Sequence, residues 1–397
     1  MKLLSQVFAI SVVSLRTIPQ RMGSSAAAAF GISGVVAVMV GVLSIGEGFR
    51  QTMTTSGSDD SVLVMRSGAD SEMTSGLSLD ETRVIADSPM IISLAEQKAV
   101  SAELFVIVNL PKRGTGTDAN VPLRGVQDGS VSVRPGFELV SGRLFEPGRN
   151  EVIVGAGAAR EFSSLNLGDS FSIGQNDWEV VGIFTSGGGV AESEIWTDAS
   201  ILQSAYRRGS GFQSVRLRLS DGEEATFQAF KDSLTSDPRL NVKVIRQSEY
   251  YSEQSALVTN LITVLGGLIA FLMGLGATFG ALNTMYSSVS NRTLEIATLR
   301  ALGFGAAPVV VSVLVESLVL SLVGGAIGGG FAYFAFDGFQ TATMNWQSFS
   351  QVTFAFNVTL GLLVQGVVYA TLIGLVGGCF PAWRAARLPI SVALRAA

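Results

Sequence analysis

Four long apolar stretches constrain this chain more than any other feature of its sequence. They run between Arg21 and Glu47, between Glu253 and Arg292, from Arg300 to Asp337 with only Glu316 inside, and from Asp337 to Arg384. A helix needs about 20 apolar residues to cross the hydrocarbon core of a bilayer. We therefore predict four transmembrane helices, at about 23–49, 255–287, 305–335 and 354–380.

The composition excludes several classes of function. Charged residues make up only 15% of the chain, against about 25% in soluble domains, and a net charge of -5 argues against a nucleic-acid partner. The sequence contains no histidine, which removes the commonest general base and metal ligand. Its single cysteine, Cys379, excludes an intrachain disulfide and a cysteine-based metal site. We therefore expect a non-catalytic membrane subunit without a catalytic residue, metal or cofactor of its own.

The Lys and Arg residues of the short flanks predict the orientation, because such residues favour the cytoplasmic side. They lie before the first span, between the second and third, and after the fourth: Lys2, Arg16, Arg21, Arg292, Arg300, Arg384, Arg387 and Arg395. The loop between the third and fourth spans has none. We expect a multi-pass protein of the bacterial inner membrane, with cytoplasmic termini and residues 50–252 outside.

Residues 1–22 are too short and too charged to cross the bilayer. An apolar helical face of Val7, Phe8, Ser11, Val12 and Leu15 predicts a helix on the cytoplasmic membrane surface, with a disordered tail as the alternative.

Residues 50–252 are long enough for a folded domain, which we expect to contain two subdomains. Alternating or β-rich segments predict strands at 61–67, 104–110, 151–156, 169–174, 178–184 and 214–220, and helical patterns occur at about 79–87, 197–206 and 222–235. Glu192 and Glu194, beside a run of three glycines, are interpreted as an exposed loop, with a mobile loop for a partner or ligand as the alternative. The fold class is therefore a four-helix membrane protein with an α+β extracytoplasmic domain.

The cytoplasmic elbow between the second and third spans, residues 289–303, carries a helical pattern. Arg292, Glu295, Ile296 and Leu299 share one face, Arg292 and Glu295 can pair, and Gly303 ends the helix. This pattern fits a helix that docks into a cytoplasmic partner and equally a simple polar hairpin.

Two features of the spans concern packing. Small residues four apart let helix backbones approach closely, and such pairs occur at Gly276 and Gly280, Gly324 and Gly328, and Gly374 and Gly378. They predict a packed bundle and permit a dimer seam. Glu316 is the one acid inside a span, which makes it a functional candidate. It can bond within the bundle, pair with another helix or be protonated.

Two strings resemble a known family. NRTLEIATLRALGF, followed by VLVESLVLSLVGGAIGG, is similar to the FtsX-domain signature of MacB-type ABC permeases at Arg292, Glu295, Ile296, Leu299, Arg300, Ala301, Leu302, Gly303, Glu316, Gly324 and Gly325. The C-terminal PAWRAARLPISVALR resembles that family's closing motif, and LSIGEGFR resembles its exit from the first span. The resemblance covers nearly the whole chain and implies an extracytoplasmic domain of the MacB periplasmic-core type.

The resemblance implies a dimer, a homodimer by expectation, driven by a separate cytoplasmic ATPase that binds the ATP. The sequence has no G-x-x-x-x-G-K-[ST] motif. The elbow residues Arg292, Glu295, Ile296, Leu299, Arg300 and Gly303 would couple the ATPase to motion of the outer domain. A periplasmic adaptor and an outer-membrane channel would complete an exporter. A lipoprotein-releasing permease of the LolC/LolE type and an FtsX-like scaffold that activates a cell-wall hydrolase remain alternatives.

The orientation is testable by side-specific labelling or protease mapping of the membrane-embedded chain. We expect residues 292–300 to react from the cytoplasmic side and residues 60–240 from the opposite side. Finding both regions on one side would remove the elbow from the reach of a cytoplasmic ATPase and contradict the coupling hypothesis.

Overall fold

The computed structural model describes residues 2–17, 22–94, 97–174, 176–346 and 349–387. Contacts divide the chain into two units. The helical unit comprises Met1–Glu47, Asn260–Phe339 and Phe356–Ala397, and the mixed-sheet unit comprises Gly48–Thr259 and Gln340–Ala355.

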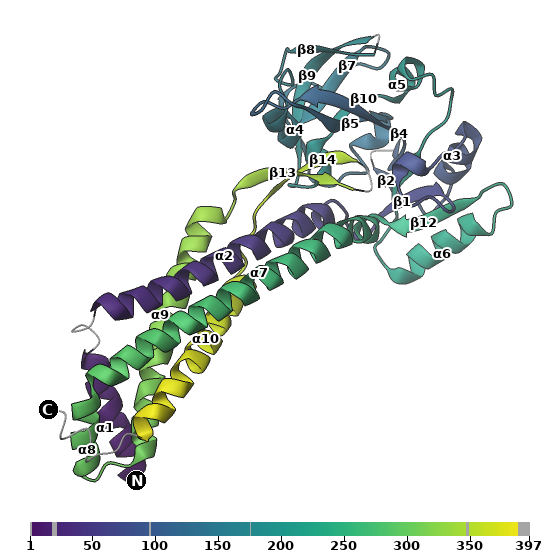
Figure 1. The fold of residues 1–397 in the computed structure, drawn as a ribbon. Coiled ribbons are helices and arrows are strands. Elements are labelled where there is room, and N and C mark those ends of the chain that lie inside the picture. Colours follow the sequence, from purple (N-terminus) through teal and green to yellow (C-terminus); the bar gives the residue numbers. More distant parts are fainter. Residues whose placement is uncertain (1, 18–21, 95–96, 175, 347–348, 388–397) are drawn as a thin grey trace. The chain divides into compact units, whose positions relative to one another are not determined.

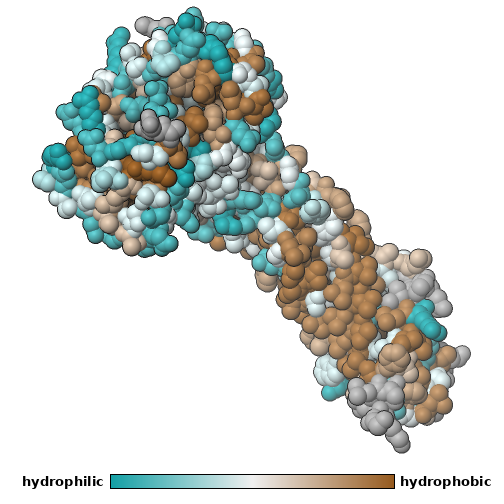
Figure 2. Space-filling view, turned by 180° about the vertical axis from the view of Figure 1, so that it is seen from behind, coloured by the Kyte–Doolittle hydropathy of each residue, from teal (hydrophilic) through white to brown (hydrophobic). Residues whose placement is uncertain are grey.

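The helical unit is built from six helices in the part of the chain that the structure describes (Figure 1). These are α1 (Lys2–Thr17), α2 (Met22–Thr55), α7 (Gln247–Asn291), α8 (Thr293–Ala301), α9 (Ala306–Phe336) and α10 (Leu360–Ala386). Among the described residues, four segments are long and apolar enough to cross a membrane: Ser25–Thr55, Gln247–Asn291, Ala306–Phe336 and Leu360–Ala386. Figure 2 shows apolar side chains covering much of the visible face of this unit.

The fourth span begins later than the sequence predicts. Residue 354 lies in strand β14 (Ser350–Ala355), which pairs with β13 (Gln340–Asn345) as an antiparallel hairpin. Helix α10 starts only at Leu360, because the Thr359 side chain accepts a hydrogen bond from the backbone N–H of Leu362 and so caps the first turn. The predicted start at 354 is therefore wrong, since apolar composition does not distinguish a buried strand from a span.

Close approach at glycines packs α9 between its neighbours. A Cβ built on Gly324 would lie 2.7 Å from the backbone oxygen of Ala29, and one on Gly328 would meet the backbone oxygen of Ser33. On α10, Gly374 and Gly378 face the side chains of Ser321 and Ser317. Because these positions have no room for a side chain, the predicted packing role of these four glycines is confirmed.

Gly276 and Gly280 on α7 behave differently. Both are exposed, and a Cβ built on either would meet no atom of the described residues within 4 Å. Within the described residues, neither glycine therefore packs closely against another helix. A role in a seam with a second copy stays a prediction.

Helix α1 lies against α9 through Ile10, Ser11 and Ser14, which are all buried. The side chains of Ser14 and Ser312 share a hydrogen bond of 2.6 Å. The apolar face that is predicted to lie on the membrane includes the exposed Phe8, and its contact with the membrane stays a prediction.

The mixed-sheet unit is organised by a ten-stranded sheet with the order β12-β1-β11-β4-β5-β10-β7-β9-β6, with β8 paired to β9. The strands are β1 (Ser61–Arg66), β4 (Val100–Pro111), β5 (Asp118–Val126), β6 (Phe137–Gly142), β7 (Glu151–Gly155), β8 (Ser170–Ile173), β9 (Asn176–Ser186), β10 (Ile195–Asp198), β11 (Ser214–Arg218) and β12 (Val242–Arg246). A small hairpin joins β2 (Ser93–Leu94) and β3 (Gln97–Lys98). The pairs β5–β10 and β7–β9 are parallel and the other pairs antiparallel, which makes a mixed sheet.

Four helices accompany the strands of this unit: α3 (Leu79–Ala86), α4 (Ala156–Glu161), α5 (Ala199–Ala205) and α6 (Glu224–Thr235). Short 3₁₀ turns occur at η2 (Glu72–Thr74), η3 (Asp128–Ser130) and η4 (Val190–Ser193). Strand β4 pairs with β11 through its first residues and with β5 through the rest, so it joins two apolar cores. The six predicted strands and three predicted helices are present, whereas β5, β6, β10 and β12 were not predicted.

The glycine contacts generate a stability prediction. Gly328→Ala forces a methyl group against the backbone of α2, and we expect it to lower the free energy of unfolding by about 1–3 kcal/mol, as for other overpacked sites. Gly276→Ala is the matched control, because its site is open. Denaturation of both variants in detergent measures the difference. Equal unfolding midpoints would contradict close packing of α9 on α2.

Candidate functional site

The elbow of the helical unit is held by one buried arginine. Arg292, only 5% exposed, donates through Nε to Glu295 at 3.0 Å. Its Nη1 donates to Glu316 on α9 at 3.2 Å and to the Ser14 hydroxyl on α1 at 2.9 Å. Ser288 on α7 donates to the other oxygen of Glu316 at 3.0 Å. We call these five residues the Arg292 cluster; it joins α1, α7, α8 and α9.

Glu316 is therefore paired with a neighbouring segment, which was one of its three predicted states. The carboxyl group is 4% exposed, and a buried carboxylate without a partner would be costly. Arg292 supplies the opposite charge and Ser288 satisfies the second oxygen. The predicted pair of Arg292 and Glu295 also forms.

The end of α8 has a regular stop signal. Gly303 has a φ of +92°, and the backbone N–H groups of Gly303 and Phe304 donate to the carbonyls of Arg300 and Leu299. This is the Schellman pattern, in which glycine takes the left-handed position. The Arg300 guanidinium donates to the carbonyl of Ala386 at 2.9 Å, which ties α8 to the end of α10.

Of the four residues predicted to share a face, Arg292, Glu295, Ile296 and Leu299, Glu295 is exposed. Arg292 and Ile296 are buried, and Leu299 is half-buried. Leu294 and Leu302 are exposed instead, with Thr298 between them. The shared helical face of Arg292, Ile296 and Leu299 turns toward the chain's own helices, so these residues position the elbow and do not form its outer surface.

A second site lies inside the mixed-sheet unit, where six charged side chains form what we call the buried charge network. Its members are Glu72 of η2, Glu103 of β4, Arg124 of β5, Arg134 after η3, Glu194 before β10 and Arg216 of β11. All six are buried, and their formal charges cancel. Burial of charges is tolerated when each is paired and hydrogen-bonded.

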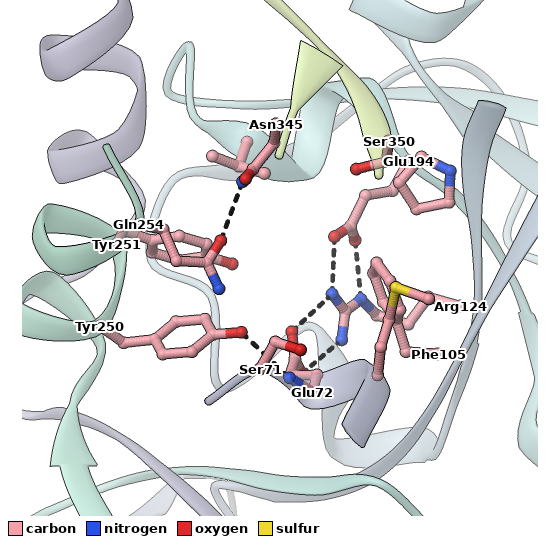
Figure 3. A pocket seen from close by; sticks show the side chains of 13 residues that line it. Ser71, Glu72, Phe105, Arg124, Glu194, Tyr250, Tyr251, Gln254, Asn345 and Ser350 are labelled. Carbon is pink, nitrogen blue, oxygen red and sulfur yellow. Dashed lines mark hydrogen bonds and ion pairs between the residues drawn. The ribbon is translucent and has the colours of Figure 1, made fainter. Parts of the chain in front are cut away.

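Arg124 is the centre of this network (Figure 3). Its Nε and Nη2 donate to the two oxygens of Glu194 at 2.8 and 2.7 Å. Its Nη1 and Nη2 donate to Glu72 at 2.9 and 3.1 Å, and Nη1 also reaches Glu103 at 3.0 Å. One guanidinium thus binds three carboxylates, two of them in the bidentate geometry that arginine favours.

Strand register explains why these groups meet. Glu103 lies opposite Ser214 in the β4–β11 ladder. Arg216 follows Ser214 by two residues on β11, so the side chains of Glu103 and Arg216 lie on the same face of the sheet. Arg134 donates through both terminal nitrogens to Glu103 at 2.7 Å. Arg216 donates to Glu72 at 2.9 Å.

The first turns of α7 contact the same network. The Tyr250 hydroxyl accepts a hydrogen bond from the backbone N–H of Glu72 at 3.2 Å, and Arg216 donates to the Tyr251 hydroxyl at 3.1 Å. One turn further, Gln254 accepts a hydrogen bond from Asn345 of β13 at 2.9 Å. These residues line a small pocket between α7 and the sheet (Figure 3).

Electrostatic interactions lower the pKa values of Glu72 and Glu103. Burial alone would raise the pKa of Glu72, but the Arg124 and Arg216 guanidiniums offset this and hold its pKa well below the usual range. Burial likewise acts to raise the pKa of Glu103, and Arg134, Arg124 and Arg216 lower it on balance. The pKa values of Glu72 and Glu103 are lower in the folded chain than in the unfolded chain. Their ionised forms therefore stabilise the fold at any pH above the ordinary pKa of glutamate. This stabilisation is lost as the pH falls from that pKa toward the lower pKa values of the folded chain.

The network was not predicted from the sequence. Glu194 was interpreted as part of an exposed loop, which is wrong, because it is 2% exposed and also accepts a hydrogen bond from the Trp196 indole at 2.7 Å. Glu192 instead accepts from the backbone N–H groups of Ser186 and Gly188. One available signal was Arg124 between apolar neighbours in the segment VPLRGV.

Two family descriptions match the chain, and together they cover most of it. Residues 25–236 match the family description "MacB-like periplasmic core domain", and residues 267–390 match "FtsX-like permease C-terminal". The chain belongs to the MacB/FtsX-type family of ABC transporter permeases. Its mixed-sheet unit is accordingly the extracytoplasmic domain, carried by a multi-pass membrane protein.

Two relatives of this MacB-family permease illustrate the match. The uncharacterized ABC transporter permease YknZ of Bacillus subtilis is 27% identical over 385 residues, which cover 92% of each chain. The macrolide export ATP-binding/permease protein MacB of Escherichia coli is 26% identical, over 92% of this chain but 56% of the relative. The chain thus spans a little over half of that longer protein. Homology to a permease confirms the prediction of a non-catalytic membrane component.

Two solved structures also match. The periplasmic region of MacB from Actinobacillus actinomycetemcomitans is 15% identical with a TM-score of 0.37, and covers 49% of this chain and 92% of that chain. The extracellular domain of YknZ is 15% identical with a TM-score of 0.33, and covers 47% of this chain and 100% of that chain.

The buried charge network generates the next prediction. Arg124→Ala removes the partner of three buried carboxylates, and we expect it to lower the free energy of unfolding by about 3–5 kcal/mol. Arg239→Ala, which breaks an exposed pair with Asp237, should cost less than about 1 kcal/mol. Urea unfolding of the full chain in detergent, followed by tryptophan fluorescence, measures both. Similar losses for the two variants would contradict a central role for Arg124.

Proposed function

We propose that this permease is the membrane subunit of an ABC exporter. It would couple ATP hydrolysis by a separate cytoplasmic ATPase to motion of the extracytoplasmic domain and extrusion of a substrate from the periplasm. The observation that supports this most is the continuity of α7, one helix from Gln247 to Asn291. Its first turns contact the buried charge network, and its end carries the Arg292 cluster.

A long helix anchored at both ends suits mechanical coupling. About 20 residues suffice to cross the bilayer, and α7 has 45. Energetic coupling between distant sites travels through rigid elements that are bonded to each site. Tyr250 and Tyr251 supply that bonding at one end, and Ser288 supplies it at the other.

The ATPase would dock on the exposed side of α8. Leu294, Thr298 and Leu302 recur at intervals of four residues, so they form one stripe. Leu294 and Leu302 are 48% and 73% exposed. Arg292 and Arg300 fix α8 against the helices behind it, so force applied to the stripe would move the bundle and not α8 alone. This role requires the cytoplasmic elbow that the Lys and Arg distribution predicts.

The other partners follow from the same proposal. ATP would be bound by the ATPase, and this chain would need no cofactor. A second copy would form a homodimer, for which the exposed Gly276 and Gly280 face of α7 offers a close-packing surface. A periplasmic adaptor and an outer-membrane channel would carry the substrate onward.

The docking stripe can be tested by a single change. We expect Leu294→Asp to reduce the stimulation of the cognate ATPase in the assembled complex by about tenfold or more, because an acidic group would be buried in the interface. Leu144→Asp is the matched control, since Leu144 is a 46% exposed leucine of the extracytoplasmic domain. ATP hydrolysis by each purified complex is the measurement.

Normal hydrolysis with Leu294→Asp, together with normal hydrolysis with Leu302→Asp, would reject α8 as the docking element. The control must keep the level of hydrolysis of the unchanged complex.

A further inference from the structure

A polar groove lies where α7 and α8 meet the end of α10 in the helical unit. Its walls are polar or aromatic except for Val289, and the residues are Asn283, Tyr286, Ser287, Ser290 and Thr293 on one side and Arg384 on the other. The groove has a volume of about 350 Å³. We call it the Arg384 groove.

The Arg384 groove carries a positive charge without a carboxylate partner. In the part of the chain that the structure describes, Arg384 forms no ion pair, and its guanidinium lies 5.6 Å from the ring centre of Tyr286. Residues 1–22, 283–316 and 381–397 contain eight Lys or Arg and two Glu, Glu295 and Glu316. Arg292 binds both glutamates, so these segments offer Arg384 no acidic side chain that is still unpaired.

The position of Arg384 along α10 indicates headgroup depth. The residue follows the apolar part of the span and lies within its last turn. Trp383 beside it is 54% exposed, and the Arg387 guanidinium lies 4.2 Å from the centre of that indole ring. Exposed tryptophan next to arginine is typical of the membrane–water interface.

The hydroxyl and amide groups of the opposite wall complete an anion site. Asn283, Ser287 and Ser290 are spaced at i, i+4 and i+7, so they share one face of α7, and all three are exposed. Hydroxyl and amide N–H groups donate to phosphate oxygens, and arginine binds phosphate through two parallel hydrogen bonds. Basic pockets between transmembrane helices bind lipid headgroups in this way.

We propose that the Arg384 groove binds the phosphate headgroup of an anionic phospholipid. Arg384 supplies the positive charge, and the polar face of α7 supplies neutral donors. The headgroup bridges α7 and α10 beside the elbow, where Arg300 already ties α8 to the last turn of α10. The inference needs only the membrane location of the chain and is independent of transport.

The test uses the full chain in detergent with equimolar phosphatidylglycerol and phosphatidylcholine, and native mass spectrometry counts the lipids retained. The unchanged chain should retain phosphatidylglycerol preferentially. We expect Arg384→Gln to reduce this retention about fivefold, which corresponds to about 1 kcal/mol per arginine near a charged membrane surface. Arg387→Gln, just past the end of α10, is the matched control. Arg387 stacks on Trp383 and does not line the groove, so its loss should change retention by less than about twofold.

A second variant separates the site from a general effect of charge or folding. Ser287→Leu fills the groove without altering charge, and should reduce phosphatidylglycerol retention while leaving the unfolding midpoint unchanged. Addition of inorganic phosphate at about 10 mM should leave the bound lipid in place, because the apolar chains add to its affinity. Equal losses with Arg384→Gln and Arg387→Gln, full retention with Ser287→Leu, or displacement by phosphate alone would each overturn the proposal.

Discussion

A charged group removed from water must find a partner of opposite charge, and this requirement organises both units. In the part of the chain that the structure describes, every buried Asp, Glu, Lys or Arg side chain takes part in an ion pair. The pairs connect residues that are far apart in sequence, such as Arg292 with Glu316 and Arg124 with Glu72. Breaking one member leaves an uncompensated charge, so each pair fixes the segments that carry it.

The buried charge network and the Arg292 cluster both pair buried charges, but they join different kinds of elements. In the mixed-sheet unit, six charges hold together strands and turns on either side of β4, the strand that joins the two apolar cores. In the helical unit, Arg292 holds the elbow against α1 and α9, and Glu316 in turn accepts a hydrogen bond from Ser288 of α7. Replacing buried ion pairs by apolar residues of similar volume is often neutral for stability. We therefore explain the buried charges by the precise arrangement of segments that they impose, and not by a gain in stability.

The sequence alone was enough to predict those features of the fold that depend on a local pattern of residues. The four apolar stretches predicted the spans, and Gly303 predicted the end of α8, because a left-handed residue after a helix is strongly favoured to be glycine. The pair of Arg292 and Glu295 was predictable because residues three apart are neighbours on a helix. The strand segments with regular alternation were predictable for the same local reason.

What the sequence did not predict depends on contacts between distant segments. Arg216 alternates with apolar residues as a surface arginine would, and only its pairing with Glu72 and Glu103 explains why it faces inward. Gly276 and Gly280 have the same spacing as Gly324 and Gly328, yet only the second pair meets another helix. Spacing shows which residues share a face, whereas the fold alone determines what that face meets.

The same distinction changes the interpretation of the elbow. A helical face shared by Arg292, Glu295, Ile296 and Leu299 was expected either to bind a partner or to form a simple polar hairpin. Arg292 is buried and bonds Glu316 and Ser14, whereas Glu295 is exposed. A coupling helix needs two faces, one that receives force and one that passes it on. The inner face of α8 combines the ion pair of Arg292 with Glu316 and the apolar packing of buried Ile296. The ion pair adds a directional contact to the apolar ones, which are non-directional. In the proposed coupling, the exposed Leu294 and Leu302 would contact the ATPase, while the hydrogen bonds of Arg292 would hold α8 to the bundle.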